Sequence, residues 1–151
     1  MRIGLISDTH GLMRPQALEA LRGCDHIVHA GDIGVPEVLD ALRALAPVSA
    51  IRGNIDRAPW AKSLPERLDL ALAAARVHVL HDLKALAFDP AAAGVHAVIC
   101  GHSHKPGLQT RDGVLYLNPG SAGPRRFKLP ISVGFLRIEG GAIAGELLEL
   151  G

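Results

Sequence analysis

Short apolar stretches bounded by turn residues recur along the first two thirds of this chain, and this pattern is typical of buried β-strands. Between the first three stretches, apolar residues at three-to-four spacing predict helices that begin after Pro15 and at Pro36. Such a β-α-β-α-β order implies parallel strands joined by right-handed crossovers. The five predicted strands cover residues 2–7, 27–30, 48–51, 76–80 and 97–100.

After Pro65 the apolar positions alternate with polar ones, which predicts antiparallel hairpins. The first hairpin joins residues around 67–72 to 76–80, although helix propensity leaves a helix over 70–75 as an alternative. The pairs Asp112-Gly113 and Gly140-Gly141 predict tight turns in two further hairpins, at 107–117 and 132–148. A parallel half followed by hairpins fits an α/β fold of two mixed sheets packed face to face, with helices outside.

Side chains that bind metals follow five of the predicted strands. In an open α/β sheet, ligands bind outside the carboxyl ends of the strands, so we expect these side chains to meet at one edge. The mixture of carboxylates, imidazoles and one amide suits Mn, Fe, Zn or Ni better than Ca or Mg. Seven ligands are too many for one ion and fit two ions that share a carboxylate. The seven are Asp8, His10, Asp32, Asn54, His81, His102 and His104.

The ordered set Asp-x-His, Gly-Asp, Gly-Asn, His and Gly-His-x-His resembles the calcineurin-like metallophosphoesterase superfamily. Chain length and the Asn-Pro-Gly-Ser segment at 118–121 resemble its smallest members, bacterial and archaeal phosphodiesterases of the YfcE type. The resemblance implies one domain over residues 1–151 with an α/β/β/α sandwich. It assigns one ion to Asp8, His10, Asp32 and His104, and the other to Asp32, Asn54, His81 and His102, so that Asp32 is the bridging carboxylate.

The resemblance also implies a phosphodiesterase for small phosphoesters, in which a metal-bridging hydroxide attacks phosphorus. Asp32, Asn54 and His81 are the expected catalytic residues, and Asn54 would also contact the phosphate. Manganese is the expected metal, with Ni, Fe and Zn as alternatives. Two other functions stay open. One is a phosphomonoesterase, and the other is a non-catalytic protein-binding scaffold, the role of one eukaryotic retromer subunit with this fold.

The chain departs from the superfamily pattern at two positions. Many members have a histidine after the Gly-Asn pair, which is thought to protonate the leaving group, but this chain has Ile55. An aliphatic side chain cannot transfer a proton, so activated leaving groups or another acid, with His10 and Asp56 as candidates, are expected. The second departure is Asp82, which follows His81 where relatives often have glycine.

Three further residues are predicted to lie near the substrate. Gly120 and Ser121 would line the site in a Gly-rich bend, and Arg125 would contact the substrate anion. For Arg125 a solvated loop is an equally open interpretation. His29 precedes Asp32 by three residues and is predicted either to support the metal site or to be a hydrogen-bonded core histidine.

Composition limits the remaining possibilities. The length of 151 residues fits one domain with a real core, and 48% hydrophobic residues exclude a mainly disordered chain. A formal charge of +1 provides no broad field for nucleic acid or membranes, and neither partner is expected. The chain shows no leader and no long apolar run, which predicts a cytoplasmic protein. Two cysteines are too few for a disulfide scaffold, and a homo-oligomer is left open.

Overall fold

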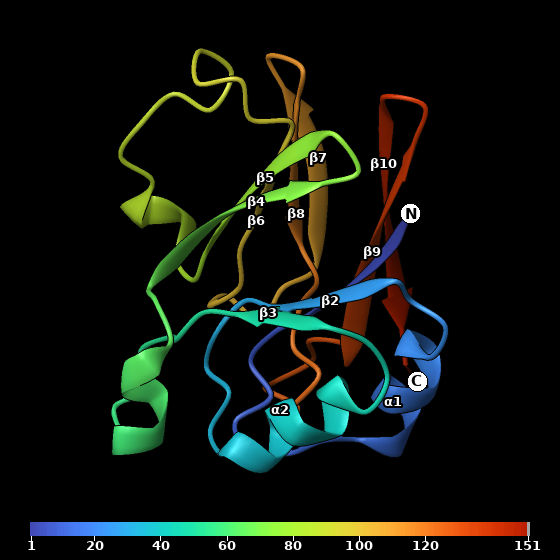
Figure 1. Ribbon diagram of the computed structural model, residues 1–151. Coiled ribbons are helices and arrows are strands. Elements are labelled where there is room, and N and C mark those ends of the chain that lie inside the picture. Colours follow the sequence, from blue (N-terminus) through green and yellow to red (C-terminus); the bar gives the residue numbers. More distant parts are fainter. Residues whose placement is uncertain (151) are drawn as a thin grey trace.

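Two five-stranded mixed sheets pack face to face in the computed structural model, which describes residues 1–150 (Figure 1). In the first sheet the strand order is β10-β9-β1-β2-β3. The three strands β1, β2 and β3 are parallel, as the β-α-β-α-β pattern predicts, and β9 joins β1 antiparallel. The strands are β1 (Arg2–Ile6), β2 (His26–His29), β3 (Val48–Ala50), β9 (Ser132–Glu139) and β10 (Ala142–Glu149).

The second sheet has the order β4-β5-β6-β8-β7. Its three central strands β5, β6 and β8 are parallel, and the two edge strands pair antiparallel with their neighbours. Its strands are β4 (Arg67–Leu72), β5 (Ala75–Leu80), β6 (Ala97–Ile99), β7 (Gly107–Arg111) and β8 (Val114–Asn118). Each sheet therefore presents the carboxyl ends of three parallel strands along one edge.

The main core lies between the two sheets and consists of aliphatic side chains at alternate strand positions. Ile3 and Leu5 of β1 face this layer from the first sheet, and Val77, Val79 and Ile99 face it from the second. The alternation places every second side chain of a strand on the same face, which is why the two sheets can share one dry interface. This interface fixes how the two sheet edges meet.

The outer layers differ between the two sheets. Helices α1 (Pro15–Leu21) and α2 (Pro36–Arg43) lie together on the outer side of the first sheet (Figure 1). Both begin at a proline, as predicted, and their apolar residues form a second core with Ile6, Ile27 and Phe135. The outer face of the second sheet carries the single turn η2 (Leu83–Ala85) and a loop, so the fourth layer of the sandwich is thin.

The hairpin from β4 to β5 replaces the alternative helix over residues 70–75. Ala73 and Ala74 both have positive φ and close the turn between the strands. Asp112 and Gly113 turn β7 into β8 in the same way. A 3₁₀ segment, η1 (Pro59–Ser63), connects β3 to β4. Within residues 1–150 no helix has both the length and the apolar character needed to cross a bilayer.

Candidate metal centre

All seven predicted ligands lie in loops that follow the carboxyl ends of parallel strands. Asp8 and His10 follow β1, Asp32 follows β2 and Asn54 follows β3 in the first sheet. His81 follows β5 in the second sheet, and His102 and His104 follow β6. The six carboxylate and imidazole ligands converge in two groups, each with its ligand atoms within 4.8 Å of one another. Each group draws side chains from both sheets.

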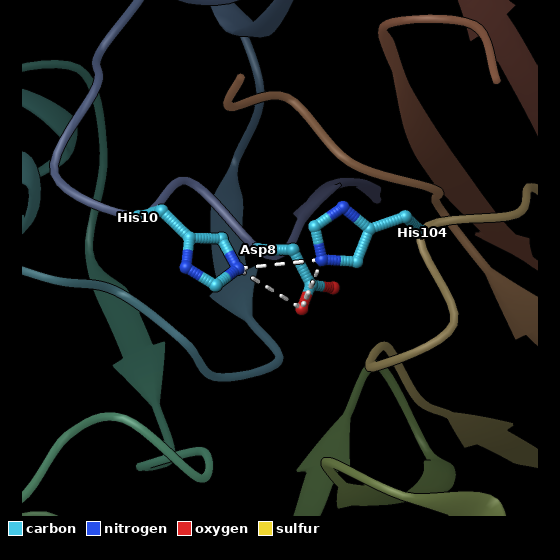
Figure 2. A group of neighbouring side chains, drawn as sticks. All are labelled: Asp8, His10 and His104. Carbon is cyan, nitrogen blue, oxygen red and sulfur yellow. Dashed lines mark hydrogen bonds and ion pairs between the residues drawn. The ribbon is translucent and has the colours of Figure 1, made fainter. Parts of the chain in front are cut away.

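The first group consists of Asp8, His10 and His104 (Figure 2). The two imidazoles point toward each other, with His10 Nε2 at 3.3 Å from His104 Nε2. Asp8 Oδ1 lies 3.5 Å from His104 Nε2 and 4.0 Å from His10 Nε2. The other oxygen, Oδ2, accepts hydrogen bonds from the Ser7 hydroxyl and the His102 N–H, so only Oδ1 faces the group.

The second group consists of Asp32, His81 and His102. His81 Nε2 lies 3.2 Å from Asp32 Oδ2, and the His81 and His102 rings are 5.2 Å apart between centroids. Asp32 Oδ2 also lies 3.7 Å from His10 Nε2 of the first group, whereas its Oδ1 accepts the Ile55 N–H. One oxygen of Asp32 is thus directed at both groups.

The donor atoms fit a bound cation because some of the buried nitrogen and oxygen atoms that face one another have no hydrogen-bond partner. The ring nitrogen His81 Nδ1 lies 2.7 Å from the Ala30 carbonyl, which only an N–H can bond, so in the neutral ring Nε2 carries the lone pair. That lone pair is directed at carboxylate oxygens. Both His81 Nε2 and Asp8 Oδ1 are buried without a hydrogen-bond partner. Buried polar atoms are almost always satisfied, so the set is incomplete without a positive charge.

The pKa values of these groups are consistent with a cation site. Burial, with Arg126 and His10 nearby, lowers the pKa of His104 to about 4, which leaves its ring neutral at neutral pH. Burial alone would raise the pKa of Asp32, but His81 and the Ile55 N–H outweigh it and lower the pKa to about 2. For His81, burial lowers the pKa, but Asp32, the Ala30 carbonyl and Asp8 together raise it. A neutral imidazole and an ionised carboxylate are the forms that bind metals.

The loops that carry the ligands hold unusual backbone conformations. Five of the nine non-glycine residues with positive φ among residues 1–150 are candidate ligands, and this region is rarely populated by residues with a side chain. Local strain of this kind persists where the surrounding structure fixes it, often at functional sites. The five are Asp8, His10, Asp32, His102 and His104.

Two glycines allow the loops to approach the carboxylates. A Cβ at Gly53 would collide with the Asp32 carboxylate and backbone, and a Cβ at Gly101 would collide with the Ser7 hydroxyl. The same Gly101 Cβ would lie 2.8 Å from Asp8 Oδ2. The glycines of the Gly-Asn and Gly-His motifs therefore serve close packing around the two carboxylates.

Asp56 holds two of the ligand-bearing loops together through backbone hydrogen bonds. Its buried carboxylate accepts the N–H groups of Ile33, Gly34 and Gly53 at 2.8–3.0 Å. These bonds tie the loop that carries Asp32 to the loop that carries Asn54. With its oxygens occupied by backbone donors, Asp56 is unsuited to the general-acid role considered for it from the sequence. Its side-chain bond to Gly53, three residues earlier, has no pattern in the sequence that would have identified it.

His29 combines the two roles that the sequence left open. It is fully buried, and its Nδ1 accepts the Gly31 N–H at 3.1 Å, so Nε2 carries the proton and donates to Thr9 Oγ1 at 3.0 Å. Thr9 Oγ1 in turn donates to the Ile33 carbonyl. Burial lowers the pKa of His29 to about 3, so the ring is neutral. It is a core histidine that holds the loops on both sides of Asp8 and Asp32.

The segment after β8 also holds loops in place. The Asn118 amide donates to Gly101 O and Ser103 Oγ, and its oxygen accepts the Gly120 N–H. Such Asn-Pro-Gly turns have a recognisable local signal, although the contact with Gly101 has none. Ser121 is buried, and its hydroxyl donates to Asp8 O at 3.0 Å. The N–H of Gly120 and the hydroxyl of Ser121 are thus engaged within the protein.

Of the predicted substrate residues, Asn54 lies beside the second group. Asn54 is exposed and lines a pocket together with His81 and Asp82. Arg125 is exposed, and its guanidinium reaches only the Leu129 carbonyl, at 3.5 Å. Substrate contact by Gly120, Ser121 and Arg125 therefore stays a prediction, as does metal ligation by Asn54.

The paired mixed sheets, with carboxylates and imidazoles gathered at one shared edge, define an α/β/β/α sandwich with a candidate metal centre. Comparisons with known proteins identify the family. Residues 1–141 match the family model described as the calcineurin-like phosphoesterase superfamily domain. A probable metallophosphoesterase of Methanothermobacter thermautotrophicus is 35% identical, over 100% of this chain and 94% of that protein.

Solved structures share the fold at lower identity. Zinc-bound Vps29 from Entamoeba histolytica has a TM-score of 0.76 at 24% identity, and each chain is covered to 100%. An archaeal phosphodiesterase has a TM-score of 0.75 at 22% identity, with 98% of this chain and 100% of that one covered. The chain belongs to the calcineurin-like phosphoesterase superfamily. The family is metal-dependent, and its model and the archaeal relative are both described as phosphoesterases, in agreement with the resemblance read from the motifs.

Proposed function

We propose that this protein is a phosphodiesterase that uses two divalent cations, manganese first among them, to hydrolyse a small phosphoester. The observation that carries the proposal is the pair of ligand groups joined at Asp32. Its Oδ2 lies 3.2 Å from His81 in one group and 3.7 Å from His10 in the other. A carboxylate oxygen so placed can serve two cations at once. Two cations there would activate water for attack on phosphorus and neutralise charge on the phosphoryl oxygens.

The chain's own residues have distinct parts in this proposal. Asp8 and Asp32 hold negative charge in a buried setting, which favours cation binding. Asn54, exposed beside His81 in the same pocket, can donate its amide hydrogens to a phosphoryl oxygen. Donors aimed at an oxygen where charge develops stabilise the transition state.

The preference for diesters with good leaving groups rests on Ile55. Its side chain is 47% exposed and aliphatic, and its N–H is used by Asp32 Oδ1. A positioned general acid typically contributes about 10²–10⁴-fold to a rate. Without one at this position, the rate should depend steeply on the leaving-group pKa. A graded series of aryl diesters would give a strongly negative slope, and a flat dependence would point to another proton donor.

One experiment tests the proposal as a whole. Cations bound per chain are counted in Mn²⁺-loaded protein, and hydrolysis of activated diesters, monoesters and cyclic nucleotides is measured. Two ions per chain and diesterase activity that chelation abolishes would support the proposal. Asp32→Asn should reduce both binding and activity more than His10→Gln, since Asp32 faces both groups. About one ion at saturation, or equal effects of the two variants, would contradict the two-cation assignment.

A non-catalytic scaffold is the alternative that this experiment separates. The likeness to Vps29 concerns the fold and favours neither function. The unpartnered donor atoms His81 Nε2 and Asp8 Oδ1 favour a cation site. Stoichiometric cation binding without hydrolysis of any ester in the panel would favour the scaffold.

A further inference from the structure

Asp82 lies at the junction of two open pockets that flank the second ligand group. One pocket, of about 200 Å³, is lined by Asn54, His81 and Asp82. The other, of about 410 Å³, is lined by Asp82, His102 and Ser103. Asp82 is the residue that the two linings share. A phosphoryl group bound at His81 and His102 would lie beside Asp82 whichever pocket its substituents entered.

The charge of Asp82 is only weakly compensated by the protein. Its Oδ1 accepts the Lys84 backbone N–H at 3.0 Å, and its Oδ2 lies 3.8 Å from His102 Nε2. In the part of the chain that the structure describes, His102 is the one basic side chain within 4.0 Å of this carboxylate. Lys84 lines the same pocket as His102, and Arg52 and Arg67 line the other. Arg52 pairs with Glu66 of that pocket, and within residues 1–150 neither Lys84 nor Arg67 forms an ion pair with Asp82. The side chain is 38% exposed, so its field reaches into both pockets.

We propose that Asp82 selects substrates by charge, admitting monoanionic phosphodiesters and disfavouring dianionic phosphomonoesters. This inference rests on the proposed function and specifies its substrate class. A phosphomonoester carries nearly two negative charges above its second pKa of about 6, whereas a diester keeps one. Repulsion from a fixed carboxylate grows in proportion to the charge of the bound group. Asp82 therefore penalises the second charge of a monoester at the place where the phosphoryl group binds.

The size of the effect follows from Coulomb's law. An extra unit charge about 6 Å from a partly exposed carboxylate, in a high-dielectric setting, corresponds to about a 3- to 10-fold change in relative rate. Salt weakens such an interaction, because the screening length falls to about 3 Å at about 1 M ionic strength. The preference for diesters should therefore diminish as salt is added.

The test compares bis(para-nitrophenyl) phosphate with para-nitrophenyl phosphate, which release the same leaving group. Asp82→Asn keeps the shape of the side chain and removes its charge. The ratio of kcat/KM for monoester to that for diester should rise about 3- to 10-fold in this variant, and salt should change the ratio less than in the wild type. Asp40→Asn is the matched control, because it makes the same change in net charge. Asp40 lies exposed on α2, outside the first sheet, where it pairs with Arg43. It should leave the ratio unchanged.

The same carboxylate also attracts cations, so all rates are measured at saturating Mn²⁺ with bound ions counted for each variant. An unchanged ratio in Asp82→Asn at full cation occupancy would overturn the charge-selection inference and leave the proposed function standing. If the Mn²⁺-loaded wild type hydrolyses neither the diester nor the monoester, the proposed function itself is contradicted.

A binding measurement decides the inference without turnover. Phenylphosphonate has no ester bond, and its monomethyl ester has only a methoxide leaving group, the kind that the proposed enzyme should hydrolyse slowest. The two ligands differ by one charge where the phosphonate is fully ionised. Calorimetric titration of the Mn²⁺-loaded protein should show that Asp82→Asn strengthens phenylphosphonate binding about 3- to 10-fold more than it strengthens binding of the ester. Equal changes for the two ligands would overturn the inference.

Discussion

At the scale of single residues, hydrogen bonds to His81 and Asp8 leave one atom of each of these two side chains directed into the centre. The Ala30 carbonyl bonds the His81 Nδ1–H, and Ser7 and the His102 N–H occupy one oxygen of Asp8. What remains directed inward is a lone pair on His81 and a single carboxylate oxygen on Asp8. The supporting bonds thus fix which atom of each side chain can bind a cation.

Cation binding is expected to expel a proton from His81. Its pKa is raised above the usual 6.5, so the imidazole is largely protonated near and below that pH in the metal-free protein. A cation needs the Nε2 lone pair, and the apparent affinity should fall as pH falls, by up to about 10-fold per pH unit for one linked proton. Calorimetry in two buffers of different ionisation enthalpy measures the released proton. The control His78→Gln should still release the proton on cation binding. If the wild type releases no proton near pH 6.5, His81 is not the group that loses it.

Asp56→Asn is expected to destabilise the fold and weaken cation binding. The substitution replaces an acceptor by a donor in front of the N–H groups of Ile33, Gly34 and Gly53. A buried donor without a partner costs about 1–3 kcal/mol in the free energy of unfolding. Chemical denaturation and Mn²⁺ titration measure the two effects.

Asp89→Asn is the control for this effect. Asp89 also accepts two backbone N–H groups, from Ala91 and Ala92, but in an exposed loop. Its replacement should change the free energy of unfolding by less than about 1 kcal/mol. If the Asp56 and Asp89 variants lose the same free energy of unfolding, the buried bonds of Asp56 contribute no more to stability than the exposed bonds of Asp89.

At the scale of elements, the site depends on loops that pass very close to one another. Gly53 packs against the Asp32 carboxylate and Gly101 against Ser7 and Asp8. These contacts join loops from different strands, and in the case of Gly101 they join loops from different sheets. The spacing of the loops is therefore set by the absence of a side chain at two positions.

Gly101→Ala is expected to displace Asp8 and reduce cation affinity. The new methyl group would overlap the Ser7 hydroxyl, so the loop or the carboxylate must shift. Overpacking of this kind typically costs about 1–3 kcal/mol in stability. Gly107→Ala provides the matched control, because a Cβ there meets nothing within 4 Å. Thermal unfolding and Mn²⁺ affinity are measured for both. Similar values for the two variants would be evidence against close packing at Gly101.

Strand positions were predictable because buried strands have a strong apolar signal, and the observed ends differ by one or two residues at most positions. The helix over 70–75 was a false alternative because propensity ignores the turn at Ala73 and Ala74 and the pairing of β4 with β5. The six carboxylate and imidazole residues that converge were visible in local motifs, and ligation by Asn54 stays a prediction. The bonds from Asp56 to Ile33, from His29 to Thr9 and from Asn118 to Gly101 join loops distant in sequence, and no local pattern encodes them.

At the scale of the whole molecule, the two sheets share a dry interface along most of their length and a polar one at a single edge. Within residues 1–150, the facing side chains at this edge are charged or polar, and each ligand group takes residues from both sheets. Metal-free protein must therefore hold the carboxylates of Asp8 and Asp32 near one another, with only neighbouring imidazoles such as His81 to offset their charge. Their proximity is one cause that raises the pKa of Asp8, after burial itself.

Cation loading is expected to stabilise the protein against heat. A ligand that binds only the folded state adds about 2.7 kcal/mol at a free concentration 100-fold above its Kd. For a domain of this size, that corresponds to a rise in Tm of about 5–10 °C. Differential scanning calorimetry with Mn²⁺ and with excess chelator measures the shift. Asp8→Asn should lose most of the rise, and an unchanged Tm in the wild type would argue against cation binding to the folded state.

Each ligand group takes side chains from both sheets, so a bound cation would link the two sheets at an edge where apolar packing does not hold them together. Amide protons in the loops at 31–34 and 101–104 would then exchange with deuterium at a rate limited by cation dissociation. The sandwich would open first along this edge when the cations dissociate. The opposite end, where Ile138 of β9 and Ile143 of β10 pack in the core between the sheets, would stay closed. The same cations would then control both the local opening of the fold at this edge and the catalytic competence of the site.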